Sequence, residues 1–229
     1  MDQRHDISEF IEWDVRNWSA ALEFWKANSS INLAGCSALE IGSDYGGLSL
    51  WLASEGANVI CSDVNGPKPE ARTKHLAAGY SRQITYASID ARNIPYTEQF
   101  NVVVMKSVLG IVGDPCTKET QARAISEIYK CLKPGGELYF AENLSASRLH
   151  RYLRGKYVKW GSKWRYPEAE EILGFLHDFS RVDHTLFGFA GTFGRNERQR
   201  NLLGVADRLI INRIVPSSWK YIIAGVAVK

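Results

Sequence analysis

Ala38-Leu39-Glu40-Ile41-Gly42-Ser43-Asp44-Tyr45-Gly46-Gly47 is the stretch that decides the fold of this 229-residue chain. Its apolar run ends at Gly42, and residues 46–56 then have the pattern of a helix that stops at a glycine. Glycine has no Cβ, so the backbone at Gly42 and Gly46 can turn sharply and approach a ligand closely. The free N–H groups of the helix that follows favour an anion, here a carboxylate. Taken alone, the turn is also compatible with a purely structural loop.

Predicted strands and helices alternate outward from this turn. Strands are predicted over residues 37–41, 58–61, 84–89, 101–106, 137–141, 182–190 and 221–228, and helices over residues 6–28, 46–56, about 69–79, 117–132, 168–178 and 196–213. Nearly unbroken apolar runs such as Val102-Val103-Val104-Met105 are typical of parallel strands covered on both faces. We therefore expect an α/β fold with a doubly wound, seven-stranded, mostly parallel sheet. It should form a single domain over residues 1–229, with a capping helix within residues 1–30.

Two carboxylates follow the next two strands after the glycine turn. Asp63 ends the second strand, roughly 20 residues beyond the turn, where an acidic residue can take both hydroxyls of a ribose. Asp90 follows the third strand, within Ser88-Ile89-Asp90-Ala91-Arg92. The carboxyl ends of parallel strands meet at one edge of a sheet, so these features should converge on one ligand.

As a set, these motifs resemble the class I S-adenosylmethionine-dependent methyltransferases. The resemblance rests on Leu39-Glu40-Ile41-Gly42 with Gly46, on Asp63, on Asp90 with Ile94-Pro95-Tyr96, on Phe100-Asn101-Val102-Val103-Val104, and on Leu132-Lys133-Pro134-Gly135-Gly136-Glu137-Leu138. It implies a Rossmann-like methyltransferase fold with S-adenosyl-L-methionine as cofactor. By resemblance, the glycines line the methionine moiety, Asp63 holds the ribose and Asp90 reaches the adenine amino group. The implied cofactor contacts are Glu40, Gly42, Ser43, Gly46, Asp63, Val64, Asp90, Ala91, Lys106 and, from the N-terminal helix, Trp18.

Two positions depart from the family pattern. Asp44 replaces the middle glycine of the family's turn, where its side chain could crowd the methionine end. Asn101 stands where an acidic residue is common before the fourth strand. The alternative for this turn is a nicotinamide-binding Rossmann enzyme. That reading is disfavoured because Asp44 would repel a pyrophosphate.

The residues after the fourth and fifth strands are candidates for catalysis. Transfer of a methyl group to a hydroxyl needs a base, whereas a carboxylate or amine acceptor can react without one. Lys106, Glu142 and His150 are the predicted catalytic residues, and Ser107 and Asp114 also qualify by position. His150 could instead be an exposed helix residue, and Lys106 could instead form a salt bridge with Asp114 or Glu142.

Residues 144–167 are interpreted as a lid over the acceptor. Between Asn143 and Pro167 the chain has seven basic residues and no acidic one, although acidic residues outnumber basic ones in the rest of the chain. Aromatic rings can stack on sugars, and arginine can grip carboxylates or phosphates. The predicted acceptor is therefore an anionic small molecule or sugar, such as a sugar acid or surface-polysaccharide precursor. The predicted acceptor contacts are Arg148, Arg151, Arg154, Tyr157, Trp160, Trp164 and Arg165.

Other classes of function remain as alternatives. The basic segment could be a solvated helix, or could bind nucleic acid, although the family's base-methylating motif is absent. The chain could also hold the cofactor without catalysis. No cysteine and histidine spacing indicates a metal site, no apolar run reaches the roughly 20 residues of a membrane span, and no signal peptide is visible. We expect a soluble, cytoplasmic protein, and the sequence indicates no particular oligomeric state.

Overall fold

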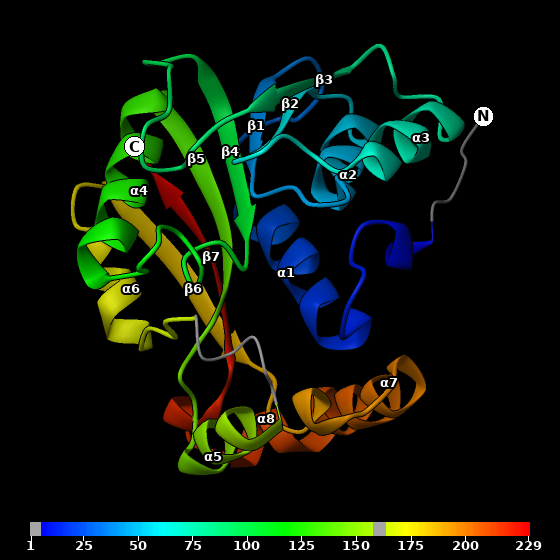
Figure 1. Cartoon of the computed structure of the whole chain (residues 1–229), viewed down its shortest axis with the longest axis vertical. Coiled ribbons are helices and arrows are strands. Elements are labelled where there is room, and N and C mark those ends of the chain that lie inside the picture. The colour runs from blue at the N-terminus through cyan, green and yellow to red at the C-terminus, as the bar shows by residue number, and fades with distance from the viewer. Residues whose placement is uncertain (1–5, 158–163) are drawn as a thin grey trace.

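The computed structural model describes residues 6–157 and 164–229 and shows one seven-stranded sheet flanked by helices (Figure 1). The strands lie in the order β3-β2-β1-β4-β5-β7-β6. Their bounds are β1 (Ser37–Ile41), β2 (Asn58–Asp63), β3 (Ile84–Ser88), β4 (Phe100–Lys106), β5 (Leu132–Asn143), β6 (Arg181–Phe187) and β7 (Ile222–Val228). Neighbours among β1 to β5 pair in parallel, and β7 runs antiparallel between β5 and β6. The predicted doubly wound, mostly parallel α/β sheet is therefore confirmed.

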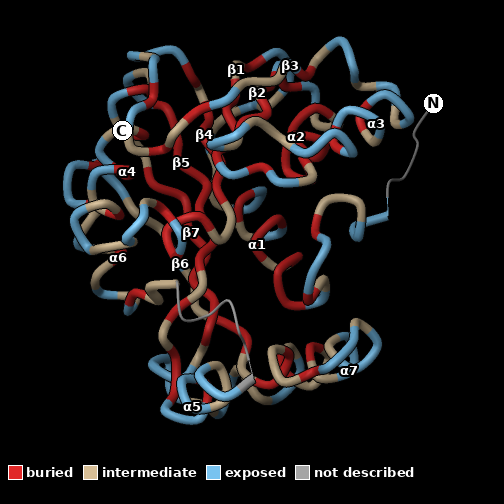
Figure 2. Tube along the Cα trace, viewed as in Figure 1, coloured by how far each residue is buried: buried red, intermediate tan, exposed pale blue. Residues whose placement is uncertain are grey.

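Helices cover both faces of the sheet. On one side α1 (Val15–Asn28) and α2 (Gly47–Ser54) pack with Trp18, Trp25 and Trp51 in a core that includes Val102 and Val104 of β4. On the other side α4 (Lys118–Cys131) and α6 (Ala169–Phe175) cover the alternate residues of β4, Val103 and Met105. Figure 2 shows the buried strands between these layers. Both faces of the central strands are apolar because helices cover both of them.

The N-terminal region differs from the predicted helix over residues 6–28. A short 3₁₀ turn, η1 (Ile7–Glu9), is followed by an irregular segment, and α1 begins only at Val15. Asp14 has a left-handed backbone, with φ at 46°, which ends any helix that precedes it. The carboxylate of Glu197 accepts hydrogen bonds from the backbone N–H groups of Asp14 and Val15, at 3.2 and 2.8 Å. A distant residue thus caps α1, which no local pattern could indicate.

Buried polar side chains connect the start of the chain to its end. Tyr221 donates its hydroxyl to Asp14, and Asn17 donates to Asp207 and Tyr221, each at 3.0 Å. Asp207 also accepts from the backbone N–H groups of Ala190 and Gly191 at 2.8 Å. Burial raises the pKa of Asp14 to about 7. We call Asp14, Asn17, Asp207 and Tyr221 the polar node.

A further group of helices lies beyond the carboxyl ends of β4 and β5 (Figure 1). It consists of α5 (Arg148–Tyr157), η3 (Gly191–Phe193), α7 (Glu197–Ala206), a π-helical turn η4 (Asp207–Ile211), α8 (Asn212–Ile214) and η5 (Ser217–Trp219). Of the helices in the described part of the chain, including α3 (Pro69–Ala77), none combines the length and apolar character that crossing a bilayer requires.

Candidate active site

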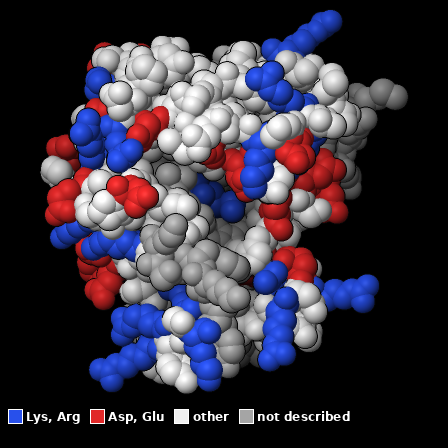
Figure 3. Space-filling view, in the orientation of Figure 1, with Lys and Arg blue, Asp and Glu red and all other residues white. Residues whose placement is uncertain are grey.

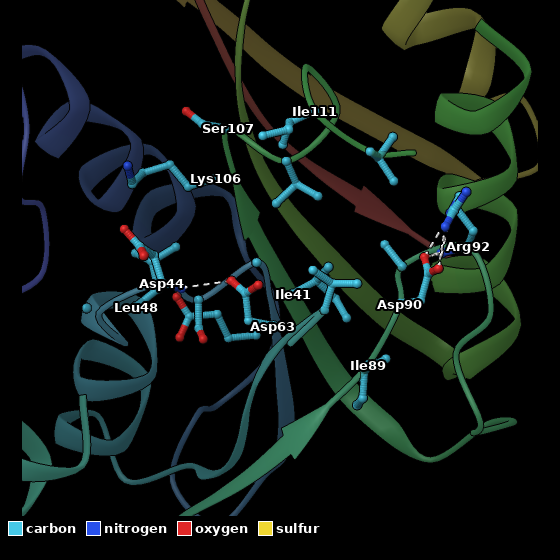
Figure 4. A pocket seen from close by; sticks show the side chains of 18 of the residues that line it. Ile41, Asp44, Leu48, Asp63, Ile89, Asp90, Arg92, Lys106, Ser107 and Ile111 are labelled. Carbon is cyan, nitrogen blue, oxygen red and sulfur yellow. Dashed lines mark hydrogen bonds and ion pairs between the residues drawn. The ribbon is translucent and has the colours of Figure 1, made fainter. Parts of the chain in front are cut away.

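A pocket of about 440 Å³ opens at the carboxyl ends of β1, β2 and β4 (Figure 4). Its volume is in the range of small-molecule sites. Eight of the ten predicted cofactor contacts line it: Glu40, Gly42, Ser43, Asp63, Val64, Asp90, Ala91 and Lys106. Gly46 and Trp18 are not among the described lining residues, because Gly46 supports the turn from behind and Trp18 is buried beneath Lys106.

The glycine turn adopts a left-handed backbone at three positions. The φ angles of Gly42, Asp44 and Gly46 are 68°, 47° and 70°. The backbone carbonyl of Gly46 is hydrogen-bonded to Nε2 of His75 at 2.8 Å, which fixes the start of α2. Asp44 tolerates this backbone, and its carboxylate forms an ion pair with Lys68 at 2.6 Å. Asp44 also lines the pocket, so the expectation that it could crowd the methionine end stays a prediction.

Glu40 secures the same turn from below. Its buried carboxylate accepts a hydrogen bond from the backbone N–H of Ser49 at 2.8 Å, and another from the Ser49 hydroxyl. Burial raises the pKa of Glu40 to about 7. Because the Glu40 carboxylate accepts these hydrogen bonds from Ser49 of α2, its main role is to hold the first turn of that helix. Part of its surface also lines the pocket.

Asp63 and Asp90 lie at separate positions along the pocket (Figure 4). One oxygen of Asp63 accepts the backbone N–H of Asp44 at 3.1 Å, and Asp63 forms no ion pair with any described residue. Asp90 instead contacts Arg92 through two nitrogens, at 3.0 and 2.7 Å. This contact with Arg92 lowers the pKa of Asp90, so its carboxylate stays ionised.

Lys106 ends β4 at the floor of the pocket. Its ammonium nitrogen lies 5.0 Å from the ring centre of Trp18, a cation–π distance. Neither Asp114 nor Glu142 forms an ion pair with it within the described residues, so the alternative of a structural salt bridge is not borne out. Burial lowers the pKa of Lys106, while the nearby carboxylates of Glu12 and Glu40 act in the opposite direction.

Glu142 is fully buried and is not among the described residues that line the pocket. One carboxylate oxygen accepts the backbone N–H groups of Val108 and Leu109, at 2.8 and 3.1 Å. The other oxygen has no hydrogen-bond partner within residues 6–157 and 164–229. Burial raises the pKa of Glu142 to about 7. Its geometry is that of a positioning residue for the loop after β4, rather than of a base that reaches a ligand.

His150 was expected at the acceptor, and the structure places it elsewhere. It is 1% exposed and packs against Phe189 and Phe193, with ring centres 5.0 and 4.7 Å away. Its two ring nitrogens are hydrogen-bonded to the Ser147 hydroxyl and the Phe189 carbonyl, at 2.7 and 2.9 Å. With both nitrogens engaged and no surface on the pocket, His150 has a packing role, and the alternative of an exposed helix residue is also wrong.

The predicted acceptor contacts are largely dispersed. Trp164 lines the pocket, but Arg154 donates to the carbonyls of Leu144 and Ser145, and Arg165 pairs with Glu171 at 2.6 Å. Arg148 and Arg151 are exposed on α5. The side chain of Tyr157 and the whole of Trp160 lie outside the described residues. Two of these arginines, Arg154 and Arg165, therefore bind groups of the protein itself, and the other two are exposed to solvent.

Several lining residues were not anticipated from the sequence. Phe10 and Glu12 reach the pocket from the irregular segment before α1, where Glu12 pairs with Lys74 at 2.5 Å. Ile111 and Val112 come from the loop after β4. That loop is apolar and follows a predicted strand end, which is the signal that could have identified it. The position of Glu12 depends on the long-range capping of α1 and had no such signal.

Solved structures with related folds confirm the architecture. Phosphoethanolamine N-methyltransferase 2 of Haemonchus contortus superposes with a TM-score of 0.63 at 17% identity, covering 93% of this chain and 52% of that protein. A putative methyltransferase of Bacillus halodurans gives a TM-score of 0.62 at 16% identity, covering 92% and 99%. The cyclase SpnF gives 0.58 at 19% identity, covering 86% and 76%. The Rossmann-like methyltransferase fold is thus shared with proteins of differing chemistry.

Residues 39–140 match the family model described as a methyltransferase domain. The predicted resemblance to the class I S-adenosylmethionine-dependent methyltransferases is therefore confirmed over this segment, and S-adenosyl-L-methionine is the cofactor of that family. Among curated proteins, the ubiquinone biosynthesis O-methyltransferase of Pseudomonas fluorescens is 35% identical over 115 residues, and that of Erwinia tasmaniensis is 30% identical over 151 residues. The alignments cover 48% and 60% of this chain, and 46% and 60% of those relatives. The chain thus spans about half of the length of the first of them.

Proposed function

We propose that this protein transfers a methyl group from S-adenosyl-L-methionine to a hydroxyl oxygen of a small, mainly apolar acceptor. The observation that carries the proposal is the pattern of charges around the pocket. Among its charged lining residues, Glu12, Asp44 and Asp90 each have a basic partner, whereas Glu40, Asp63 and Lys106 form no ion pair within the described residues. The carboxylate of Glu40 is buried and hydrogen-bonded to Ser49, which leaves Asp63 and Lys106 to face a ligand. The pocket thus offers one anionic and one cationic group to a ligand.

These two groups fit the two ends of the cofactor. Asp63 has acceptor capacity beyond its bond to Asp44, as two ribose hydroxyls require. Lys106 lies nearer to Asp44 and Leu48 than to Asp90 in Figure 4, at the methionine end of the pocket. Its ammonium, together with the N-terminus of α2, suits the methionine carboxylate. We assign Asp63 to the ribose and Lys106 to that carboxylate. Asp90 and Ala91 then lie at the adenine.

The chemistry asks little of the protein beyond alignment. The bound cofactor would supply an activated methyl group on a sulfonium, so the reaction is an in-line displacement by the acceptor oxygen. The S–CH3 bond breaks as the O–CH3 bond forms, S-adenosylhomocysteine leaves, and solvent water takes the hydroxyl proton as the base. Holding the oxygen in attack geometry can supply up to roughly 7–11 kcal/mol of rate acceleration. Glu142 orders the loop after β4 through Val108 and Leu109, and that loop supplies the wall on which the acceptor would lie.

The acceptor side of the pocket favours an apolar molecule. Its lining there includes Val108, Ile111, Val112 and Trp164, and the arginines expected to hold an anion face elsewhere. We therefore set aside the sugar or anionic acceptor in favour of a hydroxyl on a flat, mainly apolar ring. The names of the curated relatives, which methylate oxygen in ubiquinone biosynthesis, support transfer to oxygen.

The test is methyl transfer from cofactor labelled in the methyl group. Catechols and simple phenols, sugar acids and RNA are offered separately, and the products are separated and identified by mass spectrometry. Label on a phenolic oxygen is expected, and at a cofactor concentration below the dissociation constant it should fall about tenfold to hundredfold in the Asp63→Ala variant. Label on sugar acids or RNA alone would overturn the proposed acceptor. Tight cofactor binding with no label on any acceptor would favour the non-catalytic binding module instead.

A further inference from the structure

The helix formed by α7, η4 and α8 lies at one end of the molecule, beyond the sheet (Figure 1), and it carries several exposed apolar side chains. Leu202, Leu209, Ile210 and Ile214 are between 59% and 73% exposed there, and Trp219 of η5 is 46% exposed. We call these five residues the outer apolar face. A helix on the surface of a globular protein normally turns polar residues to water, so four large, exposed apolar residues on this helix depart from the usual pattern.

The outer apolar face rests on a rigid base. The ring of Trp219 stacks on Phe189 at 6.0 Å, and Phe189 also contacts His150 of α5. The buried carboxylate of Asp207 accepts three backbone N–H groups, from Phe189, Ala190 and Gly191. These contacts fix the inner side of the helix, so the exposure of its outer side does not result from a loosely packed segment.

The charges that surround the face are basic. Arg195, Arg198 and Arg213 are exposed in this region. The two acidic residues of the same stretch, Glu197 and Asp207, are engaged with the N-terminal region and the segment before α7. Arg148 and Arg151 of the neighbouring α5 are exposed as well. Figure 3 shows several basic side chains and few acidic ones at this end of the molecule.

We propose that the outer apolar face docks on an anionic lipid surface. Exposed leucine, isoleucine and tryptophan side chains with basic residues around them are what an interfacial helix uses to enter the headgroup region. The charge argues against a second copy of this chain as the occupant, because a symmetric contact would bring the exposed arginines of one copy, such as Arg198 and Arg213, close to the exposed arginines of the other. The surface is therefore complementary to lipid phosphates rather than to itself.

Docking in this way would place the pocket close to the lipid. The outer apolar face lies in the group of helices beyond the carboxyl ends of β4 and β5, and the pocket opens at the same edge of the sheet. An acceptor that partitions into the bilayer would then reach the pocket without crossing bulk water. The docking itself does not depend on methyl transfer and can be measured without cofactor.

The experiment is sedimentation of the full chain with vesicles. Vesicles of phosphatidylcholine with phosphatidylglycerol are compared with vesicles of phosphatidylcholine alone. The wild-type chain should bind the anionic vesicles, and salt should weaken that binding. Replacing Leu209 and Ile210 together by serine should lower the partition coefficient about tenfold or more. The double variant Arg198→Glu, Arg213→Glu should lower it by about tenfold or more as well.

Matched controls keep the test open to refutation. Leu76→Ser removes an exposed leucine on α3, and Arg82→Glu reverses an exposed charge far from the face. Both should leave vesicle binding within about twofold of wild type, and circular dichroism should show that all variants fold. The proposal is overturned if the wild type does not bind anionic vesicles, or if Leu76→Ser weakens binding as much as the test variants. It is also overturned if sedimentation velocity finds a dimer that the Leu209 and Ile210 change dissociates.

Discussion

Replacing Asp63 by alanine tests the proposed cofactor site most directly. The carboxylate of Asp63 is directed into the pocket and has no ion-pair partner among the described residues. A hydrogen bond to a charged group contributes about 1.5–3 kcal/mol, and two ribose hydroxyls would bond to this carboxylate. Because desolvation of the carboxylate offsets part of that gain, we expect a net loss of about 1.4–2.8 kcal/mol, or tenfold to hundredfold in the dissociation constant.

The assay is isothermal titration calorimetry with S-adenosylhomocysteine. Asp63→Asn serves as the graded control, because its amide oxygen can still accept the N–H of Asp44 and one hydroxyl. Its affinity should lie between those of wild type and Asp63→Ala. The melting temperature without ligand should change little, since the bond that is lost inside the protein is exposed. An alanine variant that binds within twofold of wild type would remove Asp63 from the site, and with it the charge argument for the pocket.

Three further predictions concern the pocket floor, the glycine turn and the polar node. Lys106→Met should weaken S-adenosylhomocysteine binding about tenfold but leave 5′-methylthioadenosine, which lacks the carboxylate, unchanged in calorimetry; equal losses would refute the assigned role. Gly46→Ala should destabilise the protein by about 2 kcal/mol or more in urea, because a Cβ there would lie 2.6 Å from the His75 ring. In the control Gly66→Ala the new Cβ would have no atom within 4 Å, and φ is 78°. This variant should therefore lose only the stability that the left-handed backbone costs an alanine. Asp14 has a pKa raised above its unfolded value, so folding stability falls as pH rises between about 4 and 7. In Asp14→Asn the loss of stability between these pH values should be smaller by on the order of 2–4 kcal/mol. The free energy of unfolding is measured in urea at pH 5 and pH 8, and an equal change with pH in the wild type and the variant would contradict this.

The fold was predictable because its determinants are local. The apolar run of β4 and the glycine turn each indicate an element within a few residues, and alternation of strands with helices then dictates a doubly wound sheet. The same logic brought Gly42, Asp63 and Asp90 to one edge, since parallel strands present their carboxyl ends together. These are the parts of the candidate site that the sequence predicted correctly.

The remaining features depend on contacts between distant segments. The break at Asp14 is stabilised by Glu197 and Tyr221, and the burial of His150 by Phe189 and Phe193. The lid arginines were predicted to bind the methyl acceptor because their charge is evident in the sequence. In the structure Arg154 donates to backbone carbonyls, and Arg165 forms an ion pair with Glu171. A histidine or arginine in a sequence does not reveal whether the protein itself already satisfies its hydrogen bonds.

The polar node makes the beginning and the end of the chain one cooperative unit. Asp14 and Asn17 cannot leave Tyr221 and Asp207 without stranding buried polar groups, which is unfavourable by about 1–3 kcal/mol for each. We therefore expect the amides of α1 to exchange with deuterium only when the whole domain unfolds, although α1 lies near the start of the chain. Proteases should likewise leave α1 uncut in the native state. The part of the pocket wall formed by Phe10 and Glu12 should therefore stay in place for as long as β7 stays in the sheet.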